Sequence, residues 1–317
     1  MNDRVQRRPL QVFCCMITPF DPDGRLDESA IEVLGERIVQ AGVGLALGTA
    51  SPGEGHSLTP AETERLYATG KRVAAGRVPA IAMGCEQRSA AEFAPFIRIA
   101  EQVGMDAVQL YQMELMHASK PGVDELERYF RTLLEGMTIP ARLSTHQQNG
   151  YTTPIDLIDR LLHDYPHIEA IHCTTDIEYM RTLVDVVDGR ADILLGGAQH
   201  LLPGLSFGAT GYLDSTGALL APRLNASVIE HYEAGRLDEM AMAYHQITRL
   251  SGISRVQKPS SGTGSVRVAK AAMSVLGLPG STLRPPYLSL DDKAHQEVAE
   301  YLKAMMIPEL ESLVPSA

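Results

Sequence analysis

The strongest constraint on the fold is a unit that repeats eight times, in which a short apolar run is followed by a longer segment of helical periodicity. Such alternation is typical of a parallel sheet whose strands are joined by crossover helices. It predicts an α/β protein with the (β/α)8 TIM-barrel architecture, which usually takes about 250 residues. The predicted strands are residues 10–18, 44–49, 79–84, 106–111, 140–146, 168–174, 191–197 and 210–216.

Two regions are expected along the chain. Residues 1–235 hold the eight repeated units and are predicted to form the barrel, and residues 236–317 are predicted to form a C-terminal helical extension packed on it. A doubly wound open sheet is the competing fold. It is less favoured because no GxGxxG motif follows the first predicted strand and no switch point is evident.

Three predicted helices begin with recognisable capping chemistry. Thr59 with Glu62, and Ser89 with Glu92, have the spacing of a capping box. Pro154 is suited to the first position of a helix, where its missing N–H is not needed. These positions predict where three loops end and three helices begin.

The charge balance excludes whole classes of partner. The chain has 28 Lys and Arg against 39 Asp and Glu, a formal net charge of -11, which repels phosphate backbones and anionic lipid. We therefore expect neither a nucleic-acid nor a membrane partner, and the N-terminal segment predicts a strand rather than a signal peptide. Four cysteines without CxxC spacing favour buried thiols in a reducing cytoplasm.

Reacting groups of a (β/α)8 barrel lie at the C-terminal ends of its strands and in the loops that follow. This rule selects His172 and Cys173 after the sixth predicted strand, and Ser144, Thr145 and His146 after the fifth. It also selects residues after the second, seventh and eighth strands: Ser51, Glu54, Gln199 and Asp214.

Several short motifs occur in a fixed order along nearly the whole chain. They are Thr18-Pro19-Phe20 with Gly24 and Asp27, Ala50-Ser51-Pro52-Gly53-Glu54 with Leu58-Thr59-Pro60, Lys270-Ala271-Ala272 with Leu276-Gly277, and Arg284-Pro285-Pro286. In order and spacing they resemble the dihydrodipicolinate synthase and N-acetylneuraminate lyase family. The resemblance implies a class I aldolase-type barrel, a homotetramer, and a small 2-oxo acid bound through a lysine Schiff base.

The resemblance also marks where this chain departs from the family. The Schiff-base lysine of the family falls on the sixth strand, and His172 stands at that position. The proton-relaying tyrosine falls on the fifth strand, where residues 143–147 contain no tyrosine. Imidazole cannot form the protonated imine that serves as the electron sink. The usual pyruvate chemistry is therefore not expected at this position.

The predicted catalytic residues are His172, Ser144 and His146. An imidazole titrates near neutrality, so His172 is suited to general acid or base catalysis; the alternative is a histidine that only satisfies a hydrogen bond. Ser144 and His146 can present a hydroxyl and an imidazole to one pocket, but the sequence identifies no acid to orient that histidine. Alternation points Cys173 to the opposite face, which favours a core thiol.

The predicted substrate-binding residues are Ser51, Glu54, Thr145, Asp214 and Gln199. For Glu54, support of its own loop is the favoured alternative, because the resemblance implies that role for this glutamate. A metal site built from histidines at strand ends (His117, His146, His172 and His200) is not expected, since no pair has HxH or HxxxH spacing. We expect no metal and no cofactor.

Three functions remain open. The first is a family member that binds a small 2-oxo or carboxylic acid at the barrel mouth and carries out lyase or hydratase chemistry by acid–base catalysis, without an imine. The second is a non-catalytic ligand-binding or regulatory homologue. The third is a pyruvate-dependent lyase with a relocated lysine, for which Lys120 is the candidate because it lies in a loop after a strand.

Overall fold

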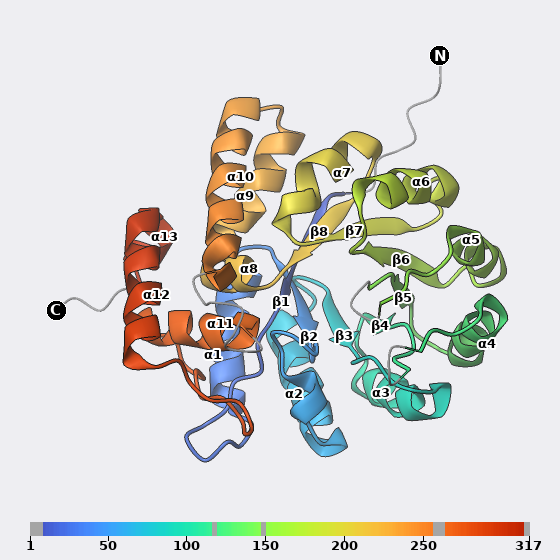
Figure 1. Cartoon of the computed structure of the whole chain (residues 1–317), viewed down its shortest axis with the longest axis horizontal. Helices are drawn as coiled ribbons and strands as arrows, with labels where there is room; N and C mark the ends of the chain where they lie inside the picture. Colours follow the sequence, from blue (N-terminus) through green and yellow to red (C-terminus); the bar gives the residue numbers. More distant parts are fainter. Residues whose placement is uncertain (1–8, 116–118, 147–149, 256–263, 314–317) are drawn as a thin grey trace. The chain divides into compact units, whose positions relative to one another are not determined.

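A computed structural model describes residues 9–115, 119–146, 150–255 and 264–313. Eight parallel strands follow one another in chain order around a closed barrel (Figure 1). All eight predicted strands are confirmed, and each is shorter than predicted because residues at one or both ends of the apolar run belong to the adjoining loops. The strands are β1 (Gln11–Cys15), β2 (Gly44–Leu47), β3 (Ala80–Met83), β4 (Ala107–Leu110), β5 (Ala141–Ser144), β6 (Ile168–Cys173), β7 (Asp192–Gly196) and β8 (Gly211–Asp214).

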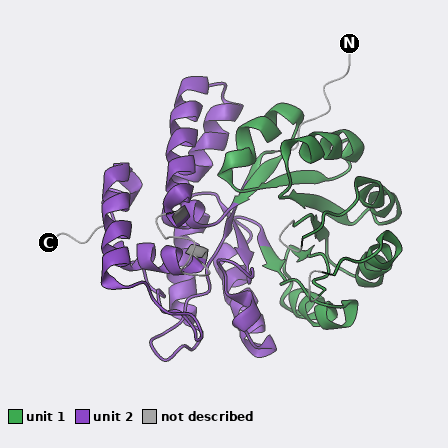
Figure 2. Ribbon diagram, viewed as in Figure 1, with its two compact units in different colours: residues 1–11, 81–213 green, residues 12–80, 214–317 purple. Residues whose placement is uncertain are grey.

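The chain divides into two compact units (Figure 2). Unit 1 comprises residues 1–11 and 81–213. In it, one helix follows each strand from β3 to β7, and α3 to α6 flank the outer side of these strands (Figure 1). The helices are α3 (Ala90–Val103), α4 (Val123–Leu134), α5 (Ile155–Asp164), α6 (Ile177–Val187) and α7 (Leu201–Phe207), with the 3-10 turn η3 (Ala198–His200) before α7.

Unit 2 comprises residues 12–80 and 214–317. Its helices α9 and α10 pack side by side (Figure 1), and the predicted boundary at residue 235 lies in the turn between them and stays a prediction. Its elements besides strands are α1 (Glu28–Gln40), η1 (Gly55–Ser57), α2 (Pro60–Ala74), α8 (Thr216–Leu220), α9 (Pro222–Glu233), α10 (Leu237–Ser251), η4 (Gly252–Arg255), α11 (Gly264–Val275), α12 (Asp292–Met305) and α13 (Pro308–Glu311).

The helix starts follow the capping chemistry of the sequence with two differences. Thr59 and Glu62 form a complete capping box at α2. Ser89 caps α3 by accepting from the N–H of Glu92, but the Glu92 carboxylate binds Arg88 instead of returning to the cap. Pro154 is the N-cap residue of α5 rather than its first helical residue. Local side-chain chemistry therefore marks these boundaries to within one residue.

The register of unit 1 decides which side chains share a face of the sheet, because aligned residues of parallel strands point the same way. Ser144 on β5 is aligned with His172 on β6. Gln109 on β4 is aligned with Arg142 on β5. Arg142 lies two residues before Ser144 and therefore on the same face of the strand. Cys173 follows His172 and points to the opposite face, as its alternation predicts. This face of β4, β5 and β6 thus carries glutamine, arginine, serine and histidine.

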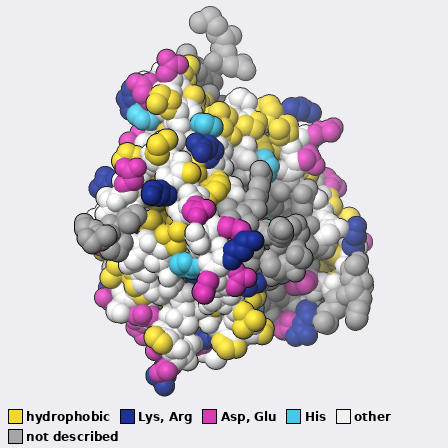
Figure 3. All heavy atoms as spheres, turned by 60° about the vertical axis from the view of Figure 1, so that its left-hand side comes forward, with side chains coloured by type: hydrophobic (Ala, Val, Ile, Leu, Met, Phe, Trp, Pro, Cys, Tyr) yellow, Lys and Arg dark blue, Asp and Glu magenta, His cyan; other side chains and the backbone are white. Residues whose placement is uncertain are grey.

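Acidic and basic side chains lie intermingled with apolar ones over the face drawn in Figure 3. On this face the charges are not sorted into blocks of one sign. Within the described ranges, every helix is too short or too polar to cross a bilayer.

Candidate functional site

His172 lies inside the barrel, at the C-terminal end of β6. Its Nδ1 lies 3.0 Å from Nε2 of Gln109 on β4. Because β5 separates β4 from β6, these two side chains can meet only on the concave side of the curved sheet. Alternate strands supply the side chains of one layer in such a barrel, which is the relation between β4 and β6. The register then places Ser144 on the same inner face.

Gln109 sets how the ring of His172 is protonated. In the observed orientation, the amide nitrogen of Gln109 donates to Nδ1, so the ring proton lies on Nε2. Burial, and then the electrostatic influence of His146 and Arg142, lower the pKa of His172 to about 3. The sequence led us to expect that His172 titrates near neutrality, whereas its buried environment lowers its pKa far below that range. At physiological pH His172 is therefore a neutral hydrogen-bond donor.

Two donors on the inner face have no hydrogen-bond partner within the described residues, namely Nε2 of His172 and Oγ of Ser144. The two residues are only 7% and 1% exposed. Buried polar groups in proteins are nearly always bonded to protein, water or a ligand. Their alignment on neighbouring strands suits a polar ligand atom, such as a carbonyl oxygen.

An acid that orients His146 is present, although the sequence did not reveal it. Oε1 of Glu86, in the loop after β3, lies 2.6 Å from Nδ1 of His146. The ring of Tyr111 packs edge-on against the imidazole, with centroids 5.9 Å apart. His146 is two residues beyond Ser144 and thus continues the same face toward the end of the strand. The rule that selects strand ends also covers Glu86, but nothing in the sequence pairs it with His146.

Thr145 and Cys173 belong to the contact between strands. The Thr145 N–H donates to the carbonyl oxygen of His172 at 3.0 Å, and the Thr174 hydroxyl donates to the carbonyl oxygen of Thr145 at 3.3 Å. Sγ of Cys173 lies 3.1 Å from the hydroxyl of Thr175, and burial raises the pKa of this thiol. These contacts support structural roles for both residues.

Two further candidates follow β7. Gln199 is exposed on the turn η3. Nδ1 of His200 lies 3.0 Å from the carbonyl oxygen of Gly196, so one ring nitrogen is engaged by the local backbone. Substrate binding by Gln199 stays a prediction.

Glu54, in unit 2, is paired with Lys270 of the Lys270-Ala271-Ala272 motif. Its Oε2 lies 2.5 Å from Nζ of Lys270 on α11, and the side chains are 0% and 1% exposed. Lys270 also donates to the carbonyl oxygen of Thr282 at 2.6 Å and lies over the ring of Phe20. The guanidinium of Arg284 lies over the same ring, 4.1 Å from its centroid. This cluster supports the loop-bracing role of Glu54.

Ser51 and Asp214 occupy different settings in unit 2. Ser51 is exposed in the loop that precedes Glu54. Asp214 is buried at the end of β8, where it accepts from the N–H of Ser215 at 2.9 Å and lies 3.5 Å from the hydroxyl of Ser251 on α10. Burial raises the pKa of Asp214 to about 6. These contacts make Asp214 a partner of the start of α8 and of α10.

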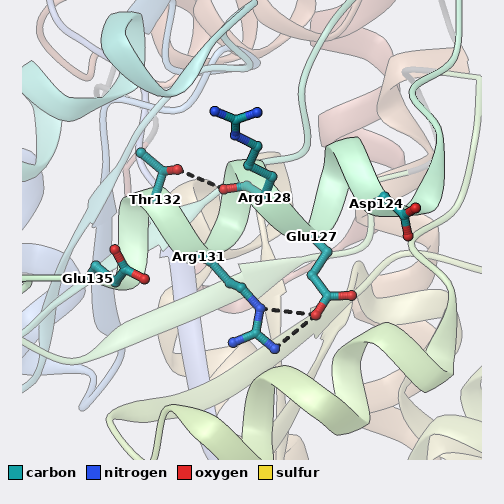
Figure 4. A pocket seen from close by; sticks show the side chains of 6 residues that line it. All are labelled: Asp124, Glu127, Arg128, Arg131, Thr132 and Glu135. Atoms are coloured by element: carbon teal, nitrogen blue, oxygen red, sulfur yellow. Dashed lines mark hydrogen bonds and ion pairs between the residues drawn. The ribbon is translucent and has the colours of Figure 1, made fainter.

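Within the described ranges, no three His, Cys, Asp or Glu side chains come together as metal ligands. His117 lies outside those ranges. A surface hollow over α4 is lined by Asp124, Glu127, Arg128, Arg131, Thr132 and Glu135 (Figure 4). Two of its charged side chains are engaged in ion pairs, since Arg131 binds both Glu127 and Asp164. The hollow lies on the outer surface of a helix, away from the strand ends where reacting groups of such a barrel lie.

Known proteins similar to this chain have the same architecture. Solved structures include YagE, a prophage protein of the dihydrodipicolinic acid synthase family from Escherichia coli K12 in complex with pyruvate. It is 22% identical with a TM-score of 0.84, covering 93% of this chain and 98% of its own. The 4-hydroxy-tetrahydrodipicolinate synthase of Methylacidiphilum fumariolicum SolV is 22% identical with a TM-score of 0.83, covering 97% of this chain and 100% of its own.

Sequence relatives extend over the same length. The 4-hydroxy-tetrahydrodipicolinate synthase of Sorangium cellulosum is 28% identical over 299 residues, which are 92% of this chain and 95% of that protein. The enzyme of the same name from Methanococcus vannielii is 27% identical over 277 residues, 87% of this chain and 91% of that protein. The model of the dihydrodipicolinate synthetase family matches residues 8–305. The chain therefore belongs to the dihydrodipicolinate synthetase family.

Proposed function

We propose that this protein binds a small 2-oxo or carboxylic acid at the C-terminal ends of β5 and β6 and acts on it as a lyase or hydratase without forming a Schiff base. The observation that carries the proposal is the pair of buried, unpartnered donors, Nε2 of His172 and Oγ of Ser144, within the described residues. Relatives named 4-hydroxy-tetrahydrodipicolinate synthase, and YagE with its bound pyruvate, support a small oxo acid as the ligand.

The two donors are suited to the carbonyl oxygen of such an acid. When a proton leaves the carbon next to a carbonyl, negative charge develops on the carbonyl oxygen. Preorganised donors in a site that excludes water stabilise that charge strongly. A neutral imidazole with its proton on Nε2 can serve as one donor, and the Ser144 hydroxyl as the other. His172 would thus polarise the carbonyl instead of exchanging a proton itself.

Neither Lys120 nor Lys270 suits the formation of a Schiff base. None of the eight strands contains a lysine. Lys120, the candidate for a relocated amine, is exposed, and Lys270 is held by Glu54 and Thr282. A nucleophilic lysine needs a desolvated site in which its amine is free to attack. Lys120 and Lys270 each lack one of these two conditions.

A non-catalytic binding protein is the second candidate function. The low pKa of His172, about 3, favours it, because this ring cannot act as an acid at neutral pH. Binding would then proceed through the same two donors without turnover. The homotetramer implied by the family resemblance and the cytoplasmic location inferred from the cysteines stay proposals, and sedimentation analysis tests the homotetramer.

Calorimetric titration with pyruvate and with longer 2-oxo acids tests ligand binding at this site. His172→Leu fills a similar volume but removes the donor, so we expect the dissociation constant to rise by roughly tenfold, as for the loss of one good hydrogen bond. His163→Ala, at an exposed histidine of α5, is the control and should bind as the unaltered protein does. Equal affinities of His172→Leu and the unaltered protein, or no binding of any acid, would contradict the proposal.

A further inference from the structure

We propose that Glu86 and His146 are the proton-transfer pair of this site, in which Glu86 positions His146 to remove a proton from the carbon next to the carbonyl of a bound 2-oxo acid. This inference rests on the proposed function. It assigns the reacting base to a residue other than His172 and gives a role to Glu86, which the sequence did not single out.

The Glu86 carboxylate holds the His146 ring in one orientation. A carboxylate 2.6 Å from Nδ1 of His146 holds the ring proton on Nδ1, and within the described residues the lone pair of Nε2 has no hydrogen-bond partner. The Glu86 and His146 side chains are 10% and 22% exposed, so the hydrogen bond is largely shielded from water. The edge of Tyr111 against the imidazole restrains the ring further. An oriented imidazole with an open Nε2 is the arrangement of a general base.

His172 and His146 differ in their burial and in their hydrogen-bond partners. His172 is buried, its Nδ1 accepts from Gln109, and its pKa is about 3. His146 lies beyond Ser144 on the same inner face and is partly exposed, so it can exchange protons with solvent. One histidine is therefore a fixed donor to the ligand, and the other is free to carry a proton. The Glu86 carboxylate favours a proton on Nδ1 of His146, whereas the Gln109 amide favours a proton on Nε2 of His172.

Removal of this proton changes no oxidation state and therefore needs no oxidant or reductant. The bond between C3 of the acid and its proton breaks, and the proton passes to Nε2 of His146. The electron pair of that bond forms the C2–C3 double bond, and the carbonyl π electrons move to the oxygen. That oxygen accepts hydrogen bonds from Nε2 of His172 and Oγ of Ser144. The imidazolium of His146, stabilised by the Glu86 carboxylate, then releases its proton to solvent.

Deuterium exchange at C3 of pyruvate in heavy water, followed by proton NMR, tests the step without knowledge of a second substrate. Glu86→Gln offers an amide to Nδ1 and favours the wrong tautomer, so exchange should slow by roughly 10²-fold or more. The dissociation constant for pyruvate should change little, because Glu86 does not contact the ligand. Glu86→Asp keeps the charge and should recover part of the rate. Glu178→Gln, at an exposed glutamate of α6, is the matched control and should exchange normally.

A second measurement examines the pair in the free protein. Nitrogen-15 histidine spectra should show His146 protonated on Nδ1, with a strongly deshielded proton that disappears in Glu86→Gln. Failure of every tested acid to bind overturns the proposed function. Binding of pyruvate without exchange, or exchange that survives Glu86→Gln, overturns the pair alone. A His146 ring protonated only on Nε2 would also overturn it.

Discussion

Lys270→Met is expected to lower the free energy of unfolding by about 3–5 kcal/mol, the loss typical when one partner of a buried ion pair is removed. Nζ of Lys270 lies 2.5 Å from Oε2 of Glu54, and both side chains are enclosed. The methionine matches the lysine in length but leaves the Glu54 carboxylate buried without its counterion. Burial lowers the pKa of Lys270 even beside this carboxylate, so the lost solvation of the lysine outweighs the benefit of the pairing.

The controls separate a lost charge pair from a lost side chain. Lys293→Met, at a lysine that is 87% exposed on α12, should change the stability by no more than about 0.5 kcal/mol. Adding Glu54→Gln to Lys270→Met removes the stranded charge and should recover part of the loss. Urea unfolding followed by circular dichroism measures all three variants. An unchanged unfolding midpoint in Lys270→Met would contradict the described pairing.

Asp214→Asn is expected to stabilise the protein by about 3 kcal/mol at pH 7.5. Burial raises the pKa of Asp214 from 3.8 to about 6, a difference that corresponds to about 3 kcal/mol. Above pH 6 the carboxylate is ionised in both folded and unfolded chains, and the full cost of burying its charge is present. As the pH falls from 6 toward 4, the folded state binds the proton first and that cost is lost. The amide oxygen of asparagine can still accept the Ser215 N–H.

Thermal or urea unfolding at pH 7.5 and at pH 4.5 measures this effect. The gain from Asp214→Asn should be largest at pH 7.5, and most of it should be absent at pH 4.5. Asp176→Asn, at an exposed aspartate that caps α6, is a control in which no such gain is expected. A destabilised Asp214→Asn at pH 7.5 would mean that the hydrogen bonds of the ionised carboxylate with Ser215, Ala218 and Ser251 outweigh the cost of burying its charge.

The fold could be predicted because it depends on patterns local in sequence. Each strand is a short apolar run between polar turns. The start of α2 is marked by Thr59, whose side chain caps the helix together with Glu62. Cys173 could be assigned to the outer face by alternation alone. Strand ends were less well predicted, since Thr145 and His146 continue an extended run beyond the last ladder residue, Ser144.

The site was predicted only in part because its pairs join residues far apart in sequence. The strand-end rule found His172, Ser144 and His146 but could not pair His146 with Glu86, since that contact depends on how two loops approach each other. The polar Gln109 inside an apolar strand is a signal that could have been followed, because a buried amide needs a partner. The low pKa of His172 arises from burial, which the sequence does not reveal.

Borohydride treatment in the presence of a 2-oxo acid that calorimetry shows to bind is the most direct test of the account, followed by intact-protein and peptide mass spectrometry. Because we propose that this chain acts on its ligand without an imine, we predict no reduced adduct on any lysine. The Lys120 peptide should be recovered unmodified. A mass increase of one reduced oxo acid, at Lys120 or at any other lysine, would contradict the claim and favour a relocated Schiff-base amine.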